Sequence, residues 1–256
     1  MNVKNSILAA AEPYLEKRII KDLIIGISLV ACELDDGSVG VAYVLRDGLP
    51  PECGAFGFAG ELMGKPAAEA AKLFTEGTDN IQRAIADAVL TAASRQVKGI
   101  RDDVRSEAFG INPDVNDTVG MVGLIGPVAK LLEDRVGELI VFDKGISDYY
   151  GAGKVCPMEK QKELLPKCNK VIITGSATIN GSIDGLLDMC GNAEEIVIVG
   201  SSTPMFPQGW KDTGVTRLAG SWWKNECKDE IFRTVSLGGG IKQLKPYAIQ
   251  KIVDVE

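Results

Sequence analysis

Lys170-Val-Ile-Ile-Thr-Gly-Ser-Ala-Thr-Ile-Asn-Gly-Ser-Ile-Asp184 is the stretch of the chain that decides the fold. Its apolar run, residues 171–173, ends in a segment rich in glycine and hydroxyl side chains, and a helical pattern follows. In an open α/β sheet such a change lies at the carboxyl end of a buried strand, where backbone N–H groups and a helix N-terminus can receive a polar ligand. The stretch therefore predicts a parallel sheet with a ligand-binding edge.

The segments around this stretch alternate between strand and helix patterns. We expect strands at 119–125, 138–143, 170–174, 195–200 and 215–220, and helices at 127–136, 157–165, 182–190 and 225–234. Near-continuous apolar strands of this kind are typical of a sheet that is buried on both faces. Residues 244–255 fit a helix and a strand equally well. The second half of the chain is therefore predicted to be an α/β domain with a mostly parallel sheet.

The first half of the chain has a different pattern. A helix is expected at 3–19, a strand at 22–34, a turn at 35–38, a second strand at 39–45 and a helix from Pro66 to 74. Asp79 can cap a further helix, because Gln82 follows three residues later and an apolar stripe begins at Ile81. We predict an α+β domain over residues 1–110 and the α/β domain over residues 111–256, with the boundary in a polar, turn-rich linker at 106–118.

Composition argues against several classes of function. The chain has 28 Lys and Arg against 35 Asp and Glu, a net charge of −7, which argues against nucleic acid and an anionic membrane as partners. No apolar run is long enough to span a bilayer and no signal peptide is evident, so we expect a cytoplasmic protein. The chain contains no His, which removes the commonest general base and any Ser-His or Cys-His pair within it.

Candidate ligand-binding residues follow three of the predicted strands. A glycine in the first strand-to-helix turn is a weak indication of a dinucleotide site. Residues 174–182 are predicted to form a loop, which lacks the lysine of a triphosphate-binding loop but has more hydroxyl and amide groups than a turn needs. Ser182 and Asp184 are expected only to cap the next helix. The predicted ligand contacts are Gly126, Thr174, Gly175, Ser176, Thr178, Asn180, Gly181, Ser201, Thr203, Pro204 and Phe206.

Two acidic residues are candidates for acid or base catalysis. Asp143 ends a predicted strand, where a carboxylate can accept hydrogen bonds from the ribose hydroxyls of NAD or of a methyl donor. A plain turn explains Asp143 equally well. Glu61 lies in a segment with five glycines between residues 48 and 64, which suits either a flap over a neighbouring site or an irregular loop.

The six cysteines do not predict a metal site. They are Cys32, Cys53, Cys156, Cys168, Cys190 and Cys227, and none forms a C-x-x-C pair. Reduced, buried thiols are therefore the simplest interpretation. Direct binding of a soft metal would require thiolates, and it would require Cys156, Cys168 and Cys190 to converge in space. No cofactor is predicted, and the metal ligands stay unknown.

Two motifs carry a resemblance to a known family. They are Val171-Ile-Ile-Thr-Gly-Ser-Ala-Thr-Ile-Asn-Gly-Ser-Ile-Asp184 and Ile196-Val-Ile-Val-Gly-Ser-Ser-Thr-Pro204. The chain resembles the putative heavy-metal chelation family over nearly its whole length. The resemblance implies a Rossmann-like second domain. For the first domain, which includes Phe58-Ala-Gly-Glu-Leu-Met-Gly64, it implies an enolase N-terminal-like fold.

The resemblance also implies a class of function. The leading hypothesis is an enzyme that acts on a pterin-, flavin- or siderophore-like compound, by condensation or hydrolysis, in a cleft between the two domains. The alternatives are a non-catalytic metal carrier and a protein similar to S-adenosylmethionine-dependent methyltransferases. The expected partner is a small polar or heteroaromatic ligand, with a heavy metal or metal chelate also open. Assembly into a homo-oligomer is open as well.

Overall fold

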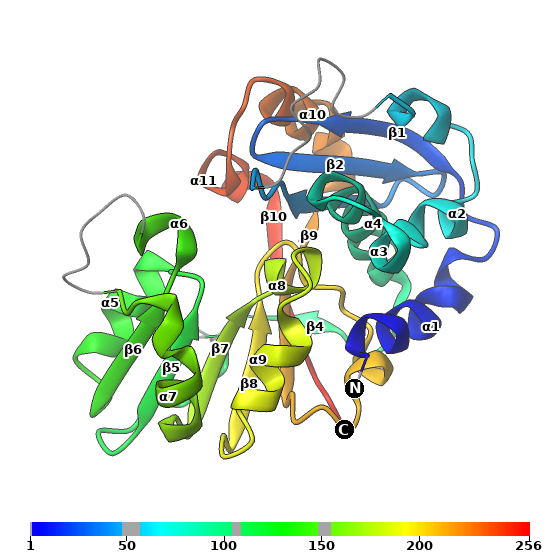
Figure 1. The fold of residues 1–256 in the computed structure, drawn as a ribbon. Coiled ribbons are helices and arrows are strands. Elements are labelled where there is room, and N and C mark those ends of the chain that lie inside the picture. Colours follow the sequence, from blue (N-terminus) through cyan, green and yellow to red (C-terminus); the bar gives the residue numbers. More distant parts are fainter. Residues whose placement is uncertain (1, 48–56, 104–108, 148–154) are drawn as a thin grey trace.

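The larger of two sheets has seven strands, in the order β4-β10-β9-β8-β7-β5-β6. The computed structural model describes residues 2–47, 57–103, 109–147 and 155–256 (Figure 1). The strands are β4 (Arg101–Asp102), β5 (Thr118–Val122), β6 (Glu138–Phe142), β7 (Lys170–Thr174), β8 (Glu195–Val199), β9 (Arg217–Trp223) and β10 (Ala248–Asp254). β5 to β9 run parallel, and β10 runs antiparallel to β9 and β4. The prediction of a mostly parallel sheet is confirmed.

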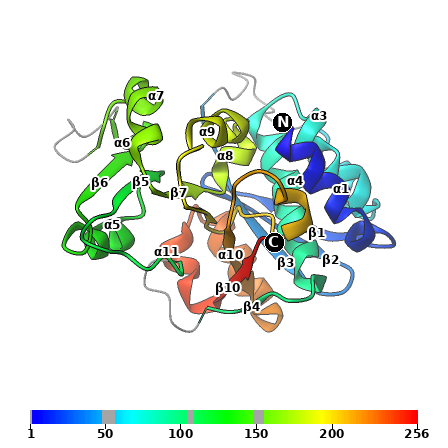
Figure 2. The same ribbon diagram turned by 90° about the horizontal axis from the view of Figure 1, so that it is seen from below.

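Both faces of this sheet are buried, as the continuous apolar runs predict. In β7, Val171 and Ile173 enter the core on one face, while Ile172 enters the core on the other face. α5 (Gly126–Glu133) covers one face, and α7 (Gln161–Leu164) and α9 (Ile183–Met189) cover the opposite face (Figure 2). The parallel strands therefore present their carboxyl ends at a single edge.

The smaller sheet has three antiparallel strands, β1 (Ile20–Ile25), β2 (Leu29–Leu34) and β3 (Val39–Tyr43). The prediction of one long strand over 22–34 was wrong. Residues 26–28 form a tight turn in which Gly26 N donates to Leu29 O at 2.8 Å. A side chain at position 26 would collide with the backbone oxygen of Val235. The predicted hairpin across the turn at 35–38 is confirmed, because residues 29–33 pair with residues 39–43.

The helices of the first half are α1 (Val3–Leu15), α2 (Ala67–Ala71), α3 (Leu73–Glu76) and α4 (Asn80–Ala93), with short 3-10 turns η1 (Ala59–Leu62) and η2 (Ser94–Gln96). Asp79 caps α4 as predicted, because its Oδ1 accepts from Ile81 N at 2.8 Å and from Gln82 N at 2.9 Å. The expected glycine-rich flap lies largely outside the described residues, together with Cys53.

The remaining helices are α6 (Lys144–Ser147), α8 (Ser176–Ile179), α10 (Lys228–Ser236) and α11 (Ile241–Leu244), with 3-10 turns η3 (Met158–Lys160), η4 (Leu165–Lys167), η5 (Pro207–Trp210), η6 (Asn225–Cys227) and η7 (Lys245–Tyr247). The ambiguous C-terminal segment resolves into α11, η7 and β10. Its strand pairs along the whole of β9, and this pairing decides the ambiguity in favour of a strand.

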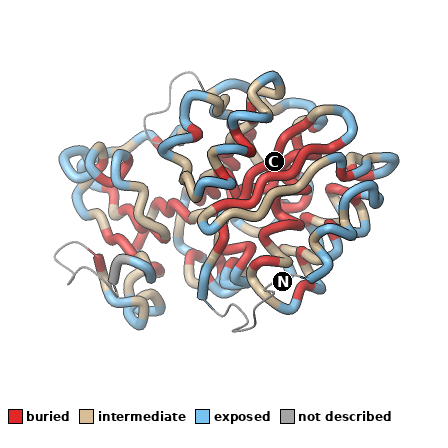
Figure 3. The backbone as a smooth tube through the Cα atoms, turned by 90° about the horizontal axis from the view of Figure 1, so that it is seen from above, coloured by how far each residue is buried: buried red, intermediate tan, exposed pale blue. Residues whose placement is uncertain are grey.

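Buried residues of both sheets belong to one hydrophobic cluster, and buried backbone runs through the middle of the molecule (Figure 3). α4 covers one face of the three-stranded sheet, while α10, from the other end of the chain, covers the opposite face. The small sheet and its helices lie over the carboxyl ends of β7 and β8 (Figure 1). β4 precedes the expected boundary near residue 110, and it pairs with β10 in the larger sheet.

Candidate functional site

The order of the parallel strands reverses between β5 and β7. The chain passes from β5 to β6 on one side, then returns and continues through β7, β8 and β9 on the other side. The two connections leave the sheet in opposite directions, so the carboxyl ends of β5 and β7 flank the point of reversal. In open α/β sheets this is where ligands bind.

The turn after β5 is shaped by Gly123. We predicted this residue to lie inside the strand, but β5 ends at Val122, and Gly123 has a φ of +89°, which strongly favours glycine. Gly123 N donates to Phe142 O at 2.7 Å, and Leu124 N donates to Asp143 Oδ2 at 2.7 Å. The half-buried Asp143 carboxylate is therefore anchored at the beginning of α5.

Thr174 meets this turn from β7. A methyl group added at Gly123 would lie 2.8 Å from Thr174 Cβ, so the two residues are in direct contact at the point of reversal. Thr174 is half-buried, and its Oγ1 accepts from Ser176 N at 3.4 Å. The structure thus brings the predicted residues Thr174 and Asp143 to the two sides of one turn.

The segment after β7 is not the open loop we predicted for residues 174–182, because residues 176–179 form the short helix α8. Thr178 is fully buried, and its hydroxyl donates to Gly175 O at 2.7 Å. Gly175 lies against the backbone of Ser202, with no room for a side chain. The hydroxyl of Thr178 therefore stabilises the turn between β7 and α8 from its buried side.

The capping role predicted for Ser182 was wrong. Its backbone is already helical, so its hydroxyl is not placed to cap α9; it donates to Asn180 Oδ1 at 2.7 Å. Gly181 follows Asn180 with a φ of +74°. Asp184 makes a long-range contact in addition to its place in the first turn of α9. Its Oδ1 accepts from Val3 N at 2.9 Å, and this hydrogen bond connects α1 to α9.

The segment after β8 is enclosed by the N-terminal part of the chain. Ser201, Thr203, Pro204 and Phe206 are all buried. Pro204 O accepts from Trp210 Nε1 at 3.2 Å, and Phe206 packs against Tyr14 with ring centroids 5.6 Å apart. Phe206 thus lies against α1, and all four predicted ligand contacts are buried in the protein.

Ser202, which we did not predict as a site residue, makes a polar contact between the segment after β8 and the end of β3. Its Oγ accepts from the backbone N–H of Tyr43 at 2.8 Å, 159 residues away in the chain. Ser202 lies among other hydroxyl residues, and no sequence pattern indicates which of them accepts the long-range hydrogen bond from Tyr43.

The two predicted acids belong to different parts of the fold. Glu61 is exposed on η1, beside a shallow apolar groove that Ala59, Gly60 and Met63 form against β1. Asp143 follows β6 in the larger sheet. Of the two, only Asp143 lies at the point of strand reversal.

A third acid, Asp87, was not predicted. It lies on α4, is fully buried, and neither carboxyl oxygen has a hydrogen-bond partner of ordinary geometry among the described residues. Burial raises the pKa of Asp87 well above its usual value, against smaller opposing effects of Lys4 and Thr178. The sequence does contain a signal, because Asp87 is the one charged residue in the otherwise apolar or hydroxyl-bearing run 84–93.

The five cysteines that the structure describes do not converge on a metal site. Cys32, Cys168 and Cys190 are buried, and burial raises the pKa of the Cys168 thiol to about 11 and that of Cys190 to about 12. Across the described ranges no three His, Cys, Asp or Glu residues are grouped to hold a metal ion, so Cys156, Cys168 and Cys190 do not meet as the metal-carrier hypothesis requires. The described thiols are buried or half-buried in the protein, as the simplest interpretation predicts.

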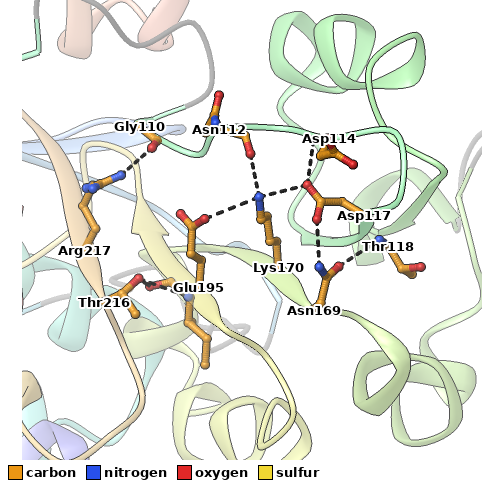
Figure 4. Close-up of polar contacts among 11 residues, drawn as sticks. Gly110, Asn112, Asp114, Asp117, Thr118, Asn169, Lys170, Glu195, Thr216 and Arg217 are labelled. Atoms are coloured by element: carbon orange, nitrogen blue, oxygen red, sulfur yellow. Dashed lines mark hydrogen bonds and ion pairs between the residues drawn. The ribbon is translucent and has the colours of Figure 1, made fainter.

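The opposite, amino-terminal edge of the same sheet carries an ion-pair network (Figure 4). Lys170 Nζ lies 2.9 Å from Asp117 Oδ2 and 3.5 Å from Glu195 Oε1, and it donates to Asn112 O at 2.5 Å. Asn169 Nδ2 donates to the other oxygen of Asp117 at 2.8 Å. The network fastens the linker at 110–118 to the first residues of β7 and β8.

Two family models match the chain, one over residues 8–94 and one over residues 107–254, and both are described as putative heavy-metal chelation. A crystal structure of a protein of unknown function from Pyrococcus horikoshii, from the family of the second match, has a TM-score of 0.82 and 20% identity, over 99% of this chain and 100% of that chain. A protein of unknown function from Desulfitobacterium hafniense, from the same family, has a TM-score of 0.76 and 19% identity, over 98% of each chain. These two structures support the fold alone.

An uncharacterized protein of Methanocaldococcus jannaschii is 25% identical to this chain over 143 residues. The match spans 55% of this chain and about half, 54%, of that protein. Within the described ranges we find no helix with the length and apolar character needed to cross a membrane.

Proposed function

We propose that this chain, which belongs to the putative heavy-metal chelation family, binds a small polar or heteroaromatic molecule at the carboxyl edge of the seven-stranded sheet and acts on it as an enzyme. The observation that carries the proposal is the reversal of strand order between β5 and β7. The family description favours a metal chelate, or a pterin-, flavin- or siderophore-like precursor of a chelator, as the ligand.

The residues around the reversal suit a ligand that has hydroxyl or amide groups. Asp143 is held by the N–H of Leu124, so it can accept a hydrogen bond from the ligand without first having to be ordered. Gly126 begins α5, and an added Cβ there would meet no atom within 4 Å, which is consistent with space for a ligand. Thr174, Ser176 and Asn180 supply polar groups from the side of β7.

In this proposal Asp143 is the acid or base of a condensation or hydrolysis, since its carboxylate accepts from Leu124 N at the strand reversal. Glu61 is the second candidate, and its role requires that η1 approach the ligand. Strands β5 to β10 and their helices would form a Rossmann-like domain over residues 111–256. Residues 1–110 would form an enolase N-terminal-like domain, with the ligand in a cleft between the two.

A methyl-donor site is the second candidate function, and Asp143 favours it. An acid at the end of the second parallel strand in the chain is the usual acceptor for ribose hydroxyls in dinucleotide sites of this sheet type. The same position would serve S-adenosylmethionine.

The test is a binding screen with the purified full chain. Thermal denaturation midpoints are measured with pterins, flavins, nucleotides, S-adenosylmethionine and their complexes with divalent metals. A compound that binds the folded state raises the midpoint with concentration. We expect at least one member of the pterin or flavin group to do so.

The location of the site is tested with a pair of variants. Asp143→Asn should weaken binding of that compound at least about tenfold, the loss of one charge-assisted hydrogen bond. Asp188→Asn changes an exposed acid on α9 and should leave the affinity unchanged. Equal affinities in both variants would place the ligand elsewhere, and a response to S-adenosylmethionine alone would favour the methyl-donor site.

A further inference from the structure

Asp87 is an unusual residue to find inside this protein. It is fully buried on α4, and within the part of the chain that the structure describes neither of its oxygens makes a hydrogen bond of ordinary geometry. An ionised carboxylate without a partner is strongly disfavoured in a protein interior, whereas a neutral carboxyl group is tolerated if it can donate its proton.

The group that can receive this proton is Thr178, on α8, which contacts α4. The Thr178 side chain is fully buried and lies beside Asp87. Its hydroxyl hydrogen is already used, because it is donated to Gly175 O at 2.7 Å. The oxygen of that hydroxyl can still accept, and a protonated Asp87 carboxyl is a donor of matching chemistry.

We propose that Asp87 is a positioning residue, whose protonated carboxyl donates to Thr178 Oγ1 and thereby holds the turn between β7 and α8 against α4. The hydrogen bonds then run in one direction, from Asp87 to Thr178 and from Thr178 to Gly175 O. Gly175 is in turn pressed against Ser202, so the chain of contacts joins α4 to both loops at the carboxyl edge.

The charges around Asp87 are arranged so that its ionisation would be costly. Lys4 from α1 is a cation that acts on Asp87, but burial lowers the pKa of Lys4 to about 8, with a further lowering by Arg83, so Lys4 is itself easily neutralised. Asp184 from α9 competes for the charge of Lys4. β2 faces α4 with the buried thiol Cys32, and α8 carries no titratable side chain.

A dependence on pH follows. Deprotonation of Asp87 removes the donor to Thr178 and leaves a buried negative charge beside it, so the turn should loosen as the pH rises through the folded pKa of Asp87. The consequence for ligand affinity rests on the proposed function. The holding of the turn does not, and it is tested without any ligand.

The experiment is hydrogen exchange of the backbone amides of residues 175–179 in the full chain, corrected for the intrinsic rate at each pH. In the wild type their protection should fall at least about tenfold as Asp87 ionises. Asp87→Asn keeps a donor for Thr178 and cannot ionise, so its protection should be independent of pH. Thr178→Val removes the acceptor, so the protection should be low at every pH, whereas Thr178→Ser should restore it.

Two controls separate Asp87 from its neighbours. Lys4→Gln removes the lysine that titrates near pH 8 and should leave the fall in protection in place. Asp188→Asn, in an exposed acid of α9, should behave as the wild type. The protonation state is read directly by carbon-13 NMR of the Asp87 carboxyl, which should be neutral at pH 7. An ionised carboxyl at pH 7, or an Asp87→Asn variant that keeps the wild-type pH dependence, would overturn the proposal.

Discussion

The two edges of the seven-stranded sheet differ in how their buried polar groups are paired. At the amino edge, Lys170 and Asp117 are buried, and each finds an oppositely charged or hydrogen-bonding partner. At the carboxyl edge, Gly123 has a positive φ, Asp143 remains half-buried, and Asp87 is buried without a charged partner in contact among the described residues. Buried polar groups without partners persist in proteins where the surroundings hold them, and groups with perturbed pKa values gather at functional sites. The comparison is consistent with a stabilising role for the amino edge and with our proposal that the carboxyl edge binds the ligand.

The largest effect is expected at the amino edge. Lys170→Ala leaves the carboxylate of Asp117 buried without its cation, which should lower the free energy of unfolding by about 3 kcal/mol, measured by urea denaturation. Lys167→Ala is the matched control, because Lys167 forms an exposed pair with Glu163 at 3.2 Å. It should cost less than about 0.5 kcal/mol. A similar, small loss in both variants would remove the contrast between the two edges.

A smaller effect is expected from strain at the carboxyl edge. Gly123→Ala forces a side chain into a positive φ and against Thr174, which should destabilise the protein by about 2 kcal/mol. Gly126→Ala lies three residues away, at a position without positive φ and with open space around it, and it should be neutral or slightly stabilising. Thermal denaturation of the two variants makes the comparison, and equal midpoints would show that position 123 accepts a side chain without strain.

The two edges should also respond to pH with opposite signs. Burial alone would raise the pKa of Asp117, but hydrogen bonds from Lys170, Asn169 and the N–H of Asp114 outweigh it and hold the pKa below its usual value. The resulting stability is present above about pH 3.9, the unfolded pKa, and it is lost as the pH falls through the folded pKa.

Asp87 should give the opposite dependence. Because burial raises its folded pKa, its contribution is fully present below about pH 3.9 and is lost as the pH rises through the folded value, by at most about 1.4 kcal/mol per pH unit. Urea denaturation gives the free energy of unfolding at each pH. Asp117→Asn should remove only the loss of stability at low pH, and Asp87→Asn should remove only the loss of stability as the pH rises. An exchange of these effects would contradict the assignment.

The smallest effect on stability is expected at Asp143. In Asp143→Asn the amide oxygen can still accept from Leu124 N, so the free energy of unfolding should change by less than about 0.5 kcal/mol in urea denaturation. A loss above about 2 kcal/mol would show that Asp143 has a structural role, and it would weaken its assignment to ligand binding.

The five parallel strands of the larger sheet could be predicted because each is a largely apolar local run, whereas β4 (Arg101–Asp102) was missed and β10 was left ambiguous. Residues 170–174 were predicted with the bounds that β7 has, and Asp79 was recognised as a cap because capping depends only on neighbours in the sequence. The turn at 26–28 was missed because Gly26 and Ser28 interrupt an apolar run too briefly to mark a turn between two strands. Residues 176–179 were assigned to a loop because glycine and hydroxyl residues favour loops, whereas packing of α8 against α4 stabilises a helix there.

The sequence by itself determined the alternation of strands and helices, the absence of histidine chemistry and the resemblance to a family, since these depend on residue type and spacing along the chain. The tertiary structure alone decided which polar residues act together. Thr174 contacts Gly123, Ser202 accepts from Tyr43, and Thr178 lies beside Asp87. These pairs are separated by 51 to 159 residues, and only the strand order and the packing of α4 over the carboxyl edge bring them together.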